Sequence, residues 1–535
     1  MPEPAVLGVA ALVGLPLLAA VAARLLRGRA SDAAAFAGAL AAAGAGAWLV
    51  AAHGLRGVHV PLGGLPALDR ALGRPVELFG VALDPLSSLV LLAAVLIGVA
   101  CVLFSAPYVG PGNRETPAPP DRRAYWFWLL VFVAAMGGLV TSATMLQMFV
   151  FWEITTVCSW ALIGHHDEEP GALEAARKAF LMTAGGGLAL LVSLVIAIAL
   201  TGSAGFDALS RLPAGARGAA GALMLLALAG AWAKSGQVPF HTWLPSAMVA
   251  PSPVSAYLHA ASLVNAGVYL VLRLALANAP QAFPVAAADP AAPGAMPAAL
   301  GGAGALGAAT AAWFAPLPVW VPGAVGVMAV LTLGVAVAQF FYQDDLKRLL
   351  ALSTISHLAL VLLGAALAFA GSARAAQGAA LHVLAHGAGK ALLFLSVGTL
   401  AYAAGTRRIG ALSGARPAAP LAAAGFLIGT LTVAGVPPFA GFWSKLLLVR
   451  GAVEVGGAGA LAAALVVAES VLAFAWLLWV GQRVFLGPPS PAAAAMAPTP
   501  AAMNAALVLL MALCLAATAF GLPLALAVRP GGFGG

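Results

Sequence analysis

Long apolar windows recur along the whole chain, each ending at glycine, proline or a charged residue. A run of about 20 apolar residues in a helix is long enough to cross a hydrocarbon core of roughly 30 Å. Lipid offers no partner for backbone polar groups, so spans of this kind form helices. The pattern predicts an all-α polytopic membrane protein with about 14 transmembrane helices, at 5–25, 33–53, 84–106, 124–142, 144–164, 177–200, 218–237, 252–276, 319–341, 346–371, 376–403, 419–447, 459–486 and 503–528.

The chain divides into five expected regions. A lysine lies beside a cluster of prolines in each half, which predicts two inverted five-helix repeats, each with a proline-broken helix. The glycine-rich stretch 294–315 is expected to form a loose loop or a surface helix and not a further span. The regions are 1–123 with helices 1–3, 124–277 as the first repeat, 278–318 as a loop, 319–486 as the second repeat, and 487–535 with helix 14.

Composition supports a membrane protein. Hydrophobic residues make up 62% of the chain and charged residues 8%, whereas soluble domains carry roughly 25% charged residues. The net charge of +8 predicts no nucleic-acid partner, because the basic residues are scattered between apolar runs. The loops with the larger share of Lys and Arg are expected on the cytoplasmic side. Fourteen spans then place both termini outside a prokaryotic inner membrane.

The three cysteines, Cys101, Cys158 and Cys514, stand far apart in apolar stretches and are expected to pack in the core. The sequence contains no motif typical of zinc, haem, an iron-sulfur cluster or a dinucleotide. We therefore expect no metal and no other cofactor.

Three lysines, Lys234, Lys390 and Lys445, fall within apolar spans. An ionisable group near the bilayer centre costs roughly 2.5–3.5 kcal/mol, so each needs a partner or a function. Lys234 precedes Pro239 and Lys445 follows Pro437, and a lysine beside a broken helix is typical of a transporter site. The alternative for Lys234 is a side chain that reaches the membrane interface.

Two glutamates also fall within spans. Glu153 lies halfway along 144–164 without a basic residue within one turn, so its partner must come from another helix, and Lys178 is one candidate. An inert buried ion pair is the alternative, although such pairs stabilise poorly. A carboxylate that responds to a neighbouring charge explains Glu153 better. Glu469 is a further acid within the membrane to which the sequence assigns no role.

The pattern LHVLAHGAGKALLF places His382, His386 and Lys390 every fourth residue, on one helix face and about 6 Å apart along the axis. Three titratable groups on one stripe predict a proton wire bridged by water; a zinc site is the weaker alternative because HExxH is missing. His259, in another apolar span, can accept and donate a proton or pack against its neighbours. The same alternatives hold for His357.

Several long motifs resemble one known family: FWEITTVCSWALIG, WAKSGQVPFHTWLP, DLKRLLALSTISHLAL, HVLAHGAGKALLFL and PPFAGFWSK. The chain is similar, from residue 80 to about 490, to the antiporter-like proton-translocating membrane subunits. These include the L-type (subunit 5) subunit of respiratory complex I, the A-type subunits of Mrp sodium/proton antiporters, and relatives in hydrogenases and inorganic-carbon pumps.

This resemblance implies a role for each matching residue. Asn265 departs from the pattern, since Mrp-type members often carry a lysine there, and the chain also ends soon after the last span. The implied proton-transfer residues are Glu153 and Lys234 as the charged pair of the first half-channel with Lys178 nearby, His259 leading inward, His382, His386 and Lys390 as the central relay, and Lys445 as the terminal site.

We therefore expect a proton-translocating membrane subunit of an NADH dehydrogenase-like or Mrp-like complex, without a self-contained active site. A component of a cation/proton antiporter is one alternative. Another is a membrane subunit that anchors a hydrogenase or inorganic-carbon uptake complex. The expected partners are the lipid bilayer and other membrane subunits, with a soluble redox or carbonic-anhydrase-like module left open.

Overall fold

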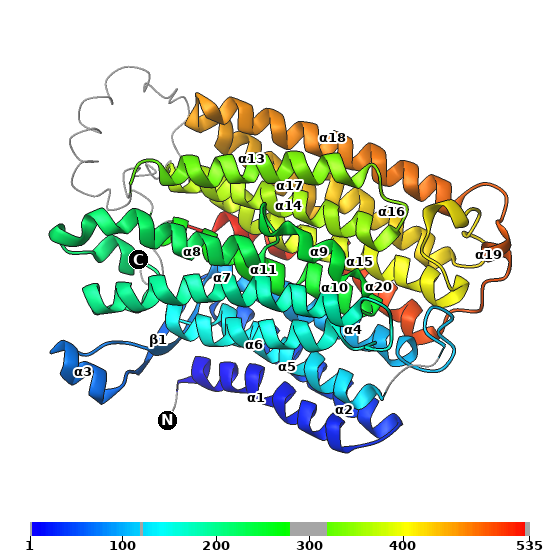
Figure 1. Ribbon diagram of the computed structural model, residues 1–535, viewed down its shortest axis with the longest axis horizontal. Coiled ribbons are helices and arrows are strands. Elements are labelled where there is room, and N and C mark those ends of the chain that lie inside the picture. Colours follow the sequence, from blue (N-terminus) through cyan, green and yellow to red (C-terminus); the bar gives the residue numbers. More distant parts are fainter. Residues whose placement is uncertain (1–2, 118–120, 279–317, 530–535) are drawn as a thin grey trace, which may run out of the picture.

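The computed structural model describes residues 3–117, 121–278 and 318–529. Figure 1 shows long helices that run side by side along one direction, with the start of the first helix and the end of the last at the same end of the bundle. An even number of crossings produces this arrangement. The predicted loop 278–318, including 294–315, lies almost entirely outside the described residues.

Thirteen segments in the described part of the chain are long and apolar enough to span a membrane. With the broken pair α16–α17, they match the fourteen predicted spans. The thirteen are α1 (Pro4–Leu25), α2 (Arg29–His53), α4 (Pro85–Tyr108), α5 (Arg122–Val140), α6 (Met145–Ile163), α7 (Ala172–Thr201), α8 (Ala220–Lys234) with the turn before it, α10 (Ser252–Ala260) joined to α11 (Leu263–Asn278), α13 (Val321–Phe340), α14 (Leu346–Phe369), α15 (Ala373–Ala404), α18 (Ala458–Phe485) and α20 (Ala501–Leu526).

A small hairpin departs from the all-α expectation. Strands β1 (Val58–Gly63) and β2 (Phe79–Leu83) pair antiparallel between α2 and α4, and the short helix α3 (Pro66–Leu72) connects them. The hairpin lies at one end of the bundle, where connections are free of the lipid constraint (Figure 1). Another short helix, α19 (Pro491–Ala494), lies at the opposite end.

Both predicted helix breaks are present. Helix α8 ends at Lys234, and three short turns follow before α10: η3 (Phe240–Thr242), α9 (Trp243–Ser246) and η4 (Ala247–Val249). Helix α16 (Pro420–Ala434) stops at Gly435, whose φ of 87° lies in the left-handed region that glycine adopts without strain. Pro437 and Pro438 follow, and α17 (Ala440–Val455) resumes. That 124–277 and 319–486 are inverted repeats remains a prediction.

A third break divides the predicted span 252–276 into α10 and α11. The Asn265 side chain donates to the carbonyl of Ala260, at 2.7 Å, and so satisfies a backbone oxygen that the break leaves free. Short amide side chains compete in this way with helical hydrogen bonds. Asn265 therefore supports a break that the apolar pattern did not reveal.

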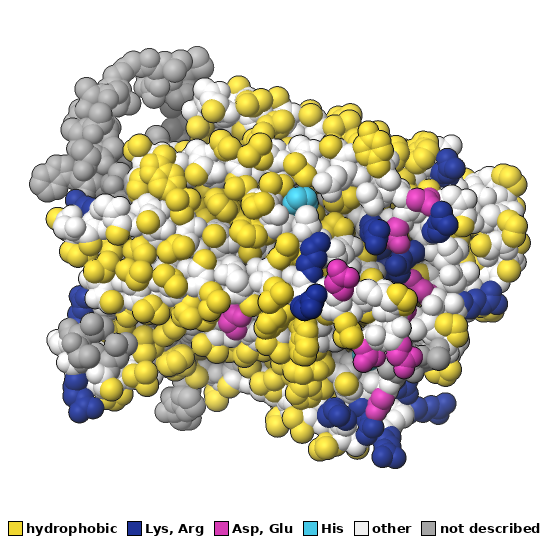
Figure 2. All heavy atoms as spheres, viewed as in Figure 1, with side chains coloured by type: hydrophobic (Ala, Val, Ile, Leu, Met, Phe, Trp, Pro, Cys, Tyr) yellow, Lys and Arg dark blue, Asp and Glu magenta, His cyan; other side chains and the backbone are white. Residues whose placement is uncertain are grey.

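The surface has an apolar middle and charged ends. In Figure 2 hydrophobic side chains cover most of the visible face along the bundle, and Lys, Arg, Asp and Glu gather mainly at the end opposite the termini. In α14 and in α15, the apolar stretch long enough to span a membrane is wholly buried. These two helices therefore form the centre of the bundle. The chain is an integral membrane protein.

Candidate functional site

Lys234 is fully buried at the end of α8 and reaches across to α6. Its Nζ atom donates to the carbonyl of Trp152 and to Thr156 Oγ1, the latter at 3.0 Å. The ammonium also lies 4.3 Å from the centroid of the Trp152 ring, a cation–π contact. The side chain points into the bundle and not to an interface, which excludes the snorkelling alternative.

Glu153 follows Trp152 on α6, yet its carboxylate does not pair directly with Lys234. Among the described residues, no cation lies within the 4.0 Å ion-pair limit of Glu153, and its buried Oε1 atom has no hydrogen-bond partner. The carboxylate lies against α7, since a Cβ atom built on Gly187 would be 2.2 Å from Oε1. The first half therefore holds its two charges close together but separated.

Lys178 does not partner Glu153 in this structure. Its Nζ atom donates to Ser246 Oγ at 3.3 Å, at the last residue of α9. Lys178 and Gly187 are nine positions apart on α7, which is about 13 Å along the helix axis. The expected direct contact with Glu153 is absent, and Lys178 instead ties α7 to the segment that follows the first break.

His259 lies on α10 and faces the central helix α15. Its ring stacks on Phe394, with centroids 5.0 Å apart and planes inclined by 28°. Both ring nitrogens are buried and have no hydrogen-bond partner among the described protein atoms. Phe394 is one turn beyond Lys390, so the structure brings His259 to the end of the predicted stripe.

Lys390 is fully buried on α15 and contacts α14. Its Nζ atom donates to Ser353 Oγ at 2.6 Å and lies 3.4 Å from the carbonyl of Leu350. No carboxylate lies within ion-pair distance of Lys390 among the described residues. The two oxygens that accept from this ammonium in the described structure are neutral, an arrangement that suits a group whose charge is not permanent.

The predicted histidine stripe is joined by His357 from α14. His357 Nδ1 lies 3.2 Å from His382 Nε2, and the His357 ring is also 5.4 Å from the ring of His386. The opposite nitrogen of His382 lies 2.9 Å from Ser444 Oγ on α17. The three rings stack side by side, and no group of three or more His, Cys, Asp or Glu in the described ranges is arranged to hold a metal ion.

Lys445 and Glu469 form a buried ion pair that the sequence did not reveal. Lys445 Nζ on α17 lies 3.2 Å from Glu469 Oε2 on α18 and 3.3 Å from the carbonyl of Ala434, at the end of the half-helix α16. Positive charge at a helix C-terminus is favourable. The other oxygen, Oε1, accepts from Ser356 Oγ at 3.2 Å and lies 3.5 Å from His357 Nε2.

Lys347 lies in the charged segment DDLKR, yet its side chain is buried at the start of α14. It is 1% exposed and donates to the carbonyl of Ala250, just before α10. Beside it, Arg407 pairs with Glu115 at 2.5 Å and with Asp345 at 2.6 Å. Burial lowers the pKa of Arg407, but the two carboxylates more than offset this and raise it above its usual value. These contacts close the end of the bundle around Lys347.

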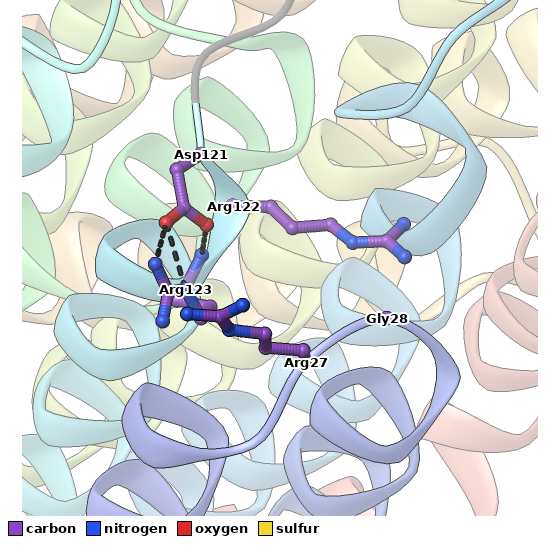
Figure 3. Close-up of a pocket in the computed structure, with 5 residues that line it drawn as sticks. All are labelled: Arg27, Gly28, Asp121, Arg122 and Arg123. Carbon is purple, nitrogen blue, oxygen red and sulfur yellow. Dashed lines mark hydrogen bonds and ion pairs between the residues drawn. The ribbon is translucent and has the colours of Figure 1, made fainter.

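A surface hollow of about 430 Å³ lies at this same end, where the turn between α1 and α2 approaches the start of α5 (Figure 3). Arg27, Gly28, Asp121, Arg122 and Arg123 line it. A hydrogen bond from the Arg123 side chain lowers the pKa of Asp121 to about 2. The hollow is far in sequence from the buried lysines and histidines, and we assign it no role in their chemistry.

The cysteines are buried as expected. Nine of the titratable side chains inside the described bundle belong to the two halves and the helices between them; eight are buried and Glu153 is half-buried. From the first half to the second they are Glu153, Lys234, His259, Lys390, His386, His382, His357, Glu469 and Lys445, of which His357 and Glu469 were not among the predicted site residues.

Comparison with known proteins explains the shared motifs. Residues 142–307 and 283–473 match a family model described as "NADH:quinone oxidoreductase/Mrp antiporter, TM". The chain is 37% identical over 360 residues to the A/B subunit of a probable K(+)/H(+) antiporter of Rhizobium meliloti (strain 1021), an alignment that covers 67% of this chain and 31% of the relative. It is 35% identical over 494 residues to "NADH-quinone oxidoreductase subunit L" of Mycobacterium tuberculosis (strain ATCC 25618 / H37Rv), which covers 89% and 67%.

Solved structures agree with these sequence relatives. The "Structure of Mrp complex from Dietzia sp. DQ12-45-1b" contains a chain with a TM-score of 0.75 and 27% identity, covering 99% of this chain and 53% of the other. The membrane-bound sulfane sulfur reductase, an archaeal respiratory membrane complex, shows the same fold with a TM-score of 0.75, 20% identity, and coverage of 95% and 76%. The chain spans from about a third to two thirds of the length of the two curated relatives. It belongs to the family of membrane-spanning subunits found in NADH:quinone oxidoreductases and Mrp antiporters.

Proposed function

We propose that this chain translocates protons across the membrane through its buried lysines and histidines. The observation that carries the proposal is the state of Lys234 and Lys390, which are fully buried in an apolar bundle where no carboxylate of the described residues lies within ion-pair distance. A buried ammonium held only by neutral groups costs several kcal/mol, so a neutral amine is accessible to it. Each lysine can then bind and release a proton.

The distance between Glu153 and Lys234 offers a way to control proton exchange at Lys234. Glu153 lies beside Trp152, whose carbonyl accepts from Lys234, and a small movement of either side chain brings the carboxylate closer to the ammonium. In a dry environment the energy between two charges changes steeply with distance. We infer that approach of Glu153 holds the proton on Lys234 and that separation releases it toward His259.

The central histidines would carry the proton onward. His259 and His386 each present two buried nitrogens without a hydrogen-bond partner among the described protein atoms. Buried polar groups in proteins are almost always bonded to protein or to ordered water. Water between Lys390 and these rings satisfies the nitrogens and supplies the connection that proton transfer requires.

We further propose that another membrane subunit covers the face around Glu153. The carboxylate is only half-buried, and its helix exposes Val150, Val157 and Trp160. Helix α7 adds exposed Leu181 and Leu188 to the same region of the bundle. An acidic group facing lipid is costly, whereas a neighbouring protein can supply a donor or a positive charge. A charge change in that neighbour would move Glu153.

A prokaryotic inner membrane with both termini on the outer side remains our proposed location, supported by the charged end that holds Lys347 and Arg407.

Substitution of Lys234 by Met, in the full complex reconstituted into vesicles, tests the function. We expect proton flux to fall at least tenfold with normal amounts of chain in the membrane. Flux equal to that of the unaltered complex would overturn the proposal.

Cation/proton exchange is the second candidate function. It is favoured by the 37% identity to a relative from a probable K(+)/H(+) antiporter and by the unpaired Oε1 atom of Glu153, an oxygen ligand of the kind that cations prefer. Dissipation of a pH gradient in vesicles separates the two functions. Dependence on added Na⁺ or K⁺ favours exchange, and flux without either cation favours proton translocation alone. A purely anchoring subunit would show neither.

A further inference from the structure

Glu469 lies between Lys445 and the three stacked histidines, which we call the histidine cluster (His357, His382 and His386). Its side chain is 1% exposed and projects from α18 between α14 and α17. One oxygen faces His357 and the other faces Lys445, at 3.5 and 3.2 Å respectively. The carboxylate therefore lies within ion-pair distance of both groups between which the proposed function requires a proton to pass.

No other described contact makes this connection. His382 reaches Ser444, the residue before Lys445, but the Ser444 hydroxyl in turn donates to the carbonyl of Gly441 at 2.9 Å. The Lys445 ammonium has two hydrogen-bond acceptors in the described structure, the Glu469 carboxylate and the carbonyl of Ala434. A backbone carbonyl cannot relay a proton under these conditions, whereas a carboxylate can.

We infer that Glu469 is a proton-transfer residue that links the histidine cluster to Lys445. The inference rests on the proposed function and adds a step to it. A proton on His357 Nε2 passes to Oε1, so that an N–H bond breaks, an O–H bond forms, and the imidazolium becomes neutral. Rotation of the carboxyl group by half a turn presents this proton to a neutral Lys445 amine. The amine becomes an ammonium, and the carboxylate is regenerated beside it.

Contacts on the neighbouring helices suit a carboxylate that exchanges partners. Ser356 donates to Oε1 at 3.2 Å and orients the group toward α14. Lys445, His357 and Lys390 are the charged or titratable groups near it on α17, α14 and α15. Helix α16, which also packs against α18, carries no titratable side chain. The carboxylate thus has one permanent neutral donor and two partners whose charge can change.

Proton flux in vesicles containing the full complex tests this inference with Glu469→Gln, Glu469→Asp and Ser356→Ala. Gln keeps the size of the side chain but cannot take up a proton, so we expect at least a tenfold loss of flux. Asp keeps the exchangeable group on a shorter side chain and should recover a measurable part of it. Ser356→Ala removes a neutral contact and should reduce flux less than threefold.

Infrared difference spectra give a readout that a purely structural role would not move. A carboxyl band that changes during proton flux, and that Glu469→Gln removes, is the expected result. The double variant Lys445→Met with Glu469→Gln, which buries no charge, controls for assembly: it should reach the membrane in normal amounts yet carry no flux.

The outcomes separate the two proposals. If Lys234→Met abolishes flux while Glu469→Gln keeps it and the carboxyl band is unchanged, the assignment of Glu469 is overturned and the proposed function survives. If Lys234→Met also keeps full flux, the proposed function itself fails.

Discussion

Lys445 Nζ and Glu469 Oε2 lie 3.2 Å apart inside the membrane-spanning bundle, whereas Lys234 has no carboxylate within ion-pair distance in the described part of the chain. The two halves thus hold their lysines in different electrostatic states: Lys445 in the second half is paired with a carboxylate, and Lys234 in the first half is not. A proton that moves from Lys234 to Lys445 would therefore leave an unpaired lysine and arrive at a paired one.

The Lys445–Glu469 ion pair should contribute to the free energy of unfolding. Substitution of Lys445 by Met leaves Glu469 buried without its cation, and breaking a buried pair in this way costs about 3–5 kcal/mol. We expect a lower thermal midpoint in detergent than for the unaltered protein. Adding Glu469→Gln to the same chain should recover most of the loss, and a double variant as unstable as Lys445→Met would contradict the pairing.

The position of the Glu153 carboxylate depends on a glycine in α7. A Cβ atom on Gly187 would lie 2.2 Å from Glu153 Oε1, so Gly187→Ala must displace the carboxylate. We expect proton flux to change several-fold, because the Glu153–Lys234 separation changes. Gly185→Ala is the matched control on the same helix, since a Cβ atom there meets nothing within 4 Å. Equal flux in both variants would argue against control by the position of Glu153.

Thr156 should stabilise the charged form of Lys234. Its hydroxyl accepts from Lys234 at 3.0 Å, and a hydrogen bond to a charged group contributes about 1.5–3 kcal/mol. Thr156→Val removes this acceptor from the charged form, and flux should fall about tenfold or more. Thr155→Val is the control, because Thr155 Oγ1 contacts the carbonyl of Trp152 instead of the ammonium. A similar loss in both variants would indicate general damage to α6.

Much of the fold could be predicted from the sequence, because lipid makes span length and proline position decisive. The stripe of His382, His386 and Lys390 could also be predicted, since helix periodicity alone places them on one face. The contacts between helices could not. Glu469 is 24 positions from Lys445 and 112 from His357, and no local pattern indicates which helices α18 touches.

The same limit explains two further differences. Lys347 stands in a charged segment typical of a solvated turn, yet helix packing buries it against the carbonyl of Ala250. Asn265 looks like a neutral substitute for a lysine, whereas in the structure it supports the break between α10 and α11. In each case the deciding neighbour comes from the tertiary arrangement and not from the adjacent sequence.

Proton translocation by this chain requires buried lysines that can lose their charge. Solid-state nuclear magnetic resonance of the full complex in lipid, with labelled lysine side chains assigned through Lys234→Met, Lys390→Met and Lys445→Met, measures this directly. We predict that Lys234 and Lys390 show a neutral amine within the pH range in which the complex stays folded. Ammonium signals from all three lysines throughout that range, with or without an imposed proton gradient, would contradict the account.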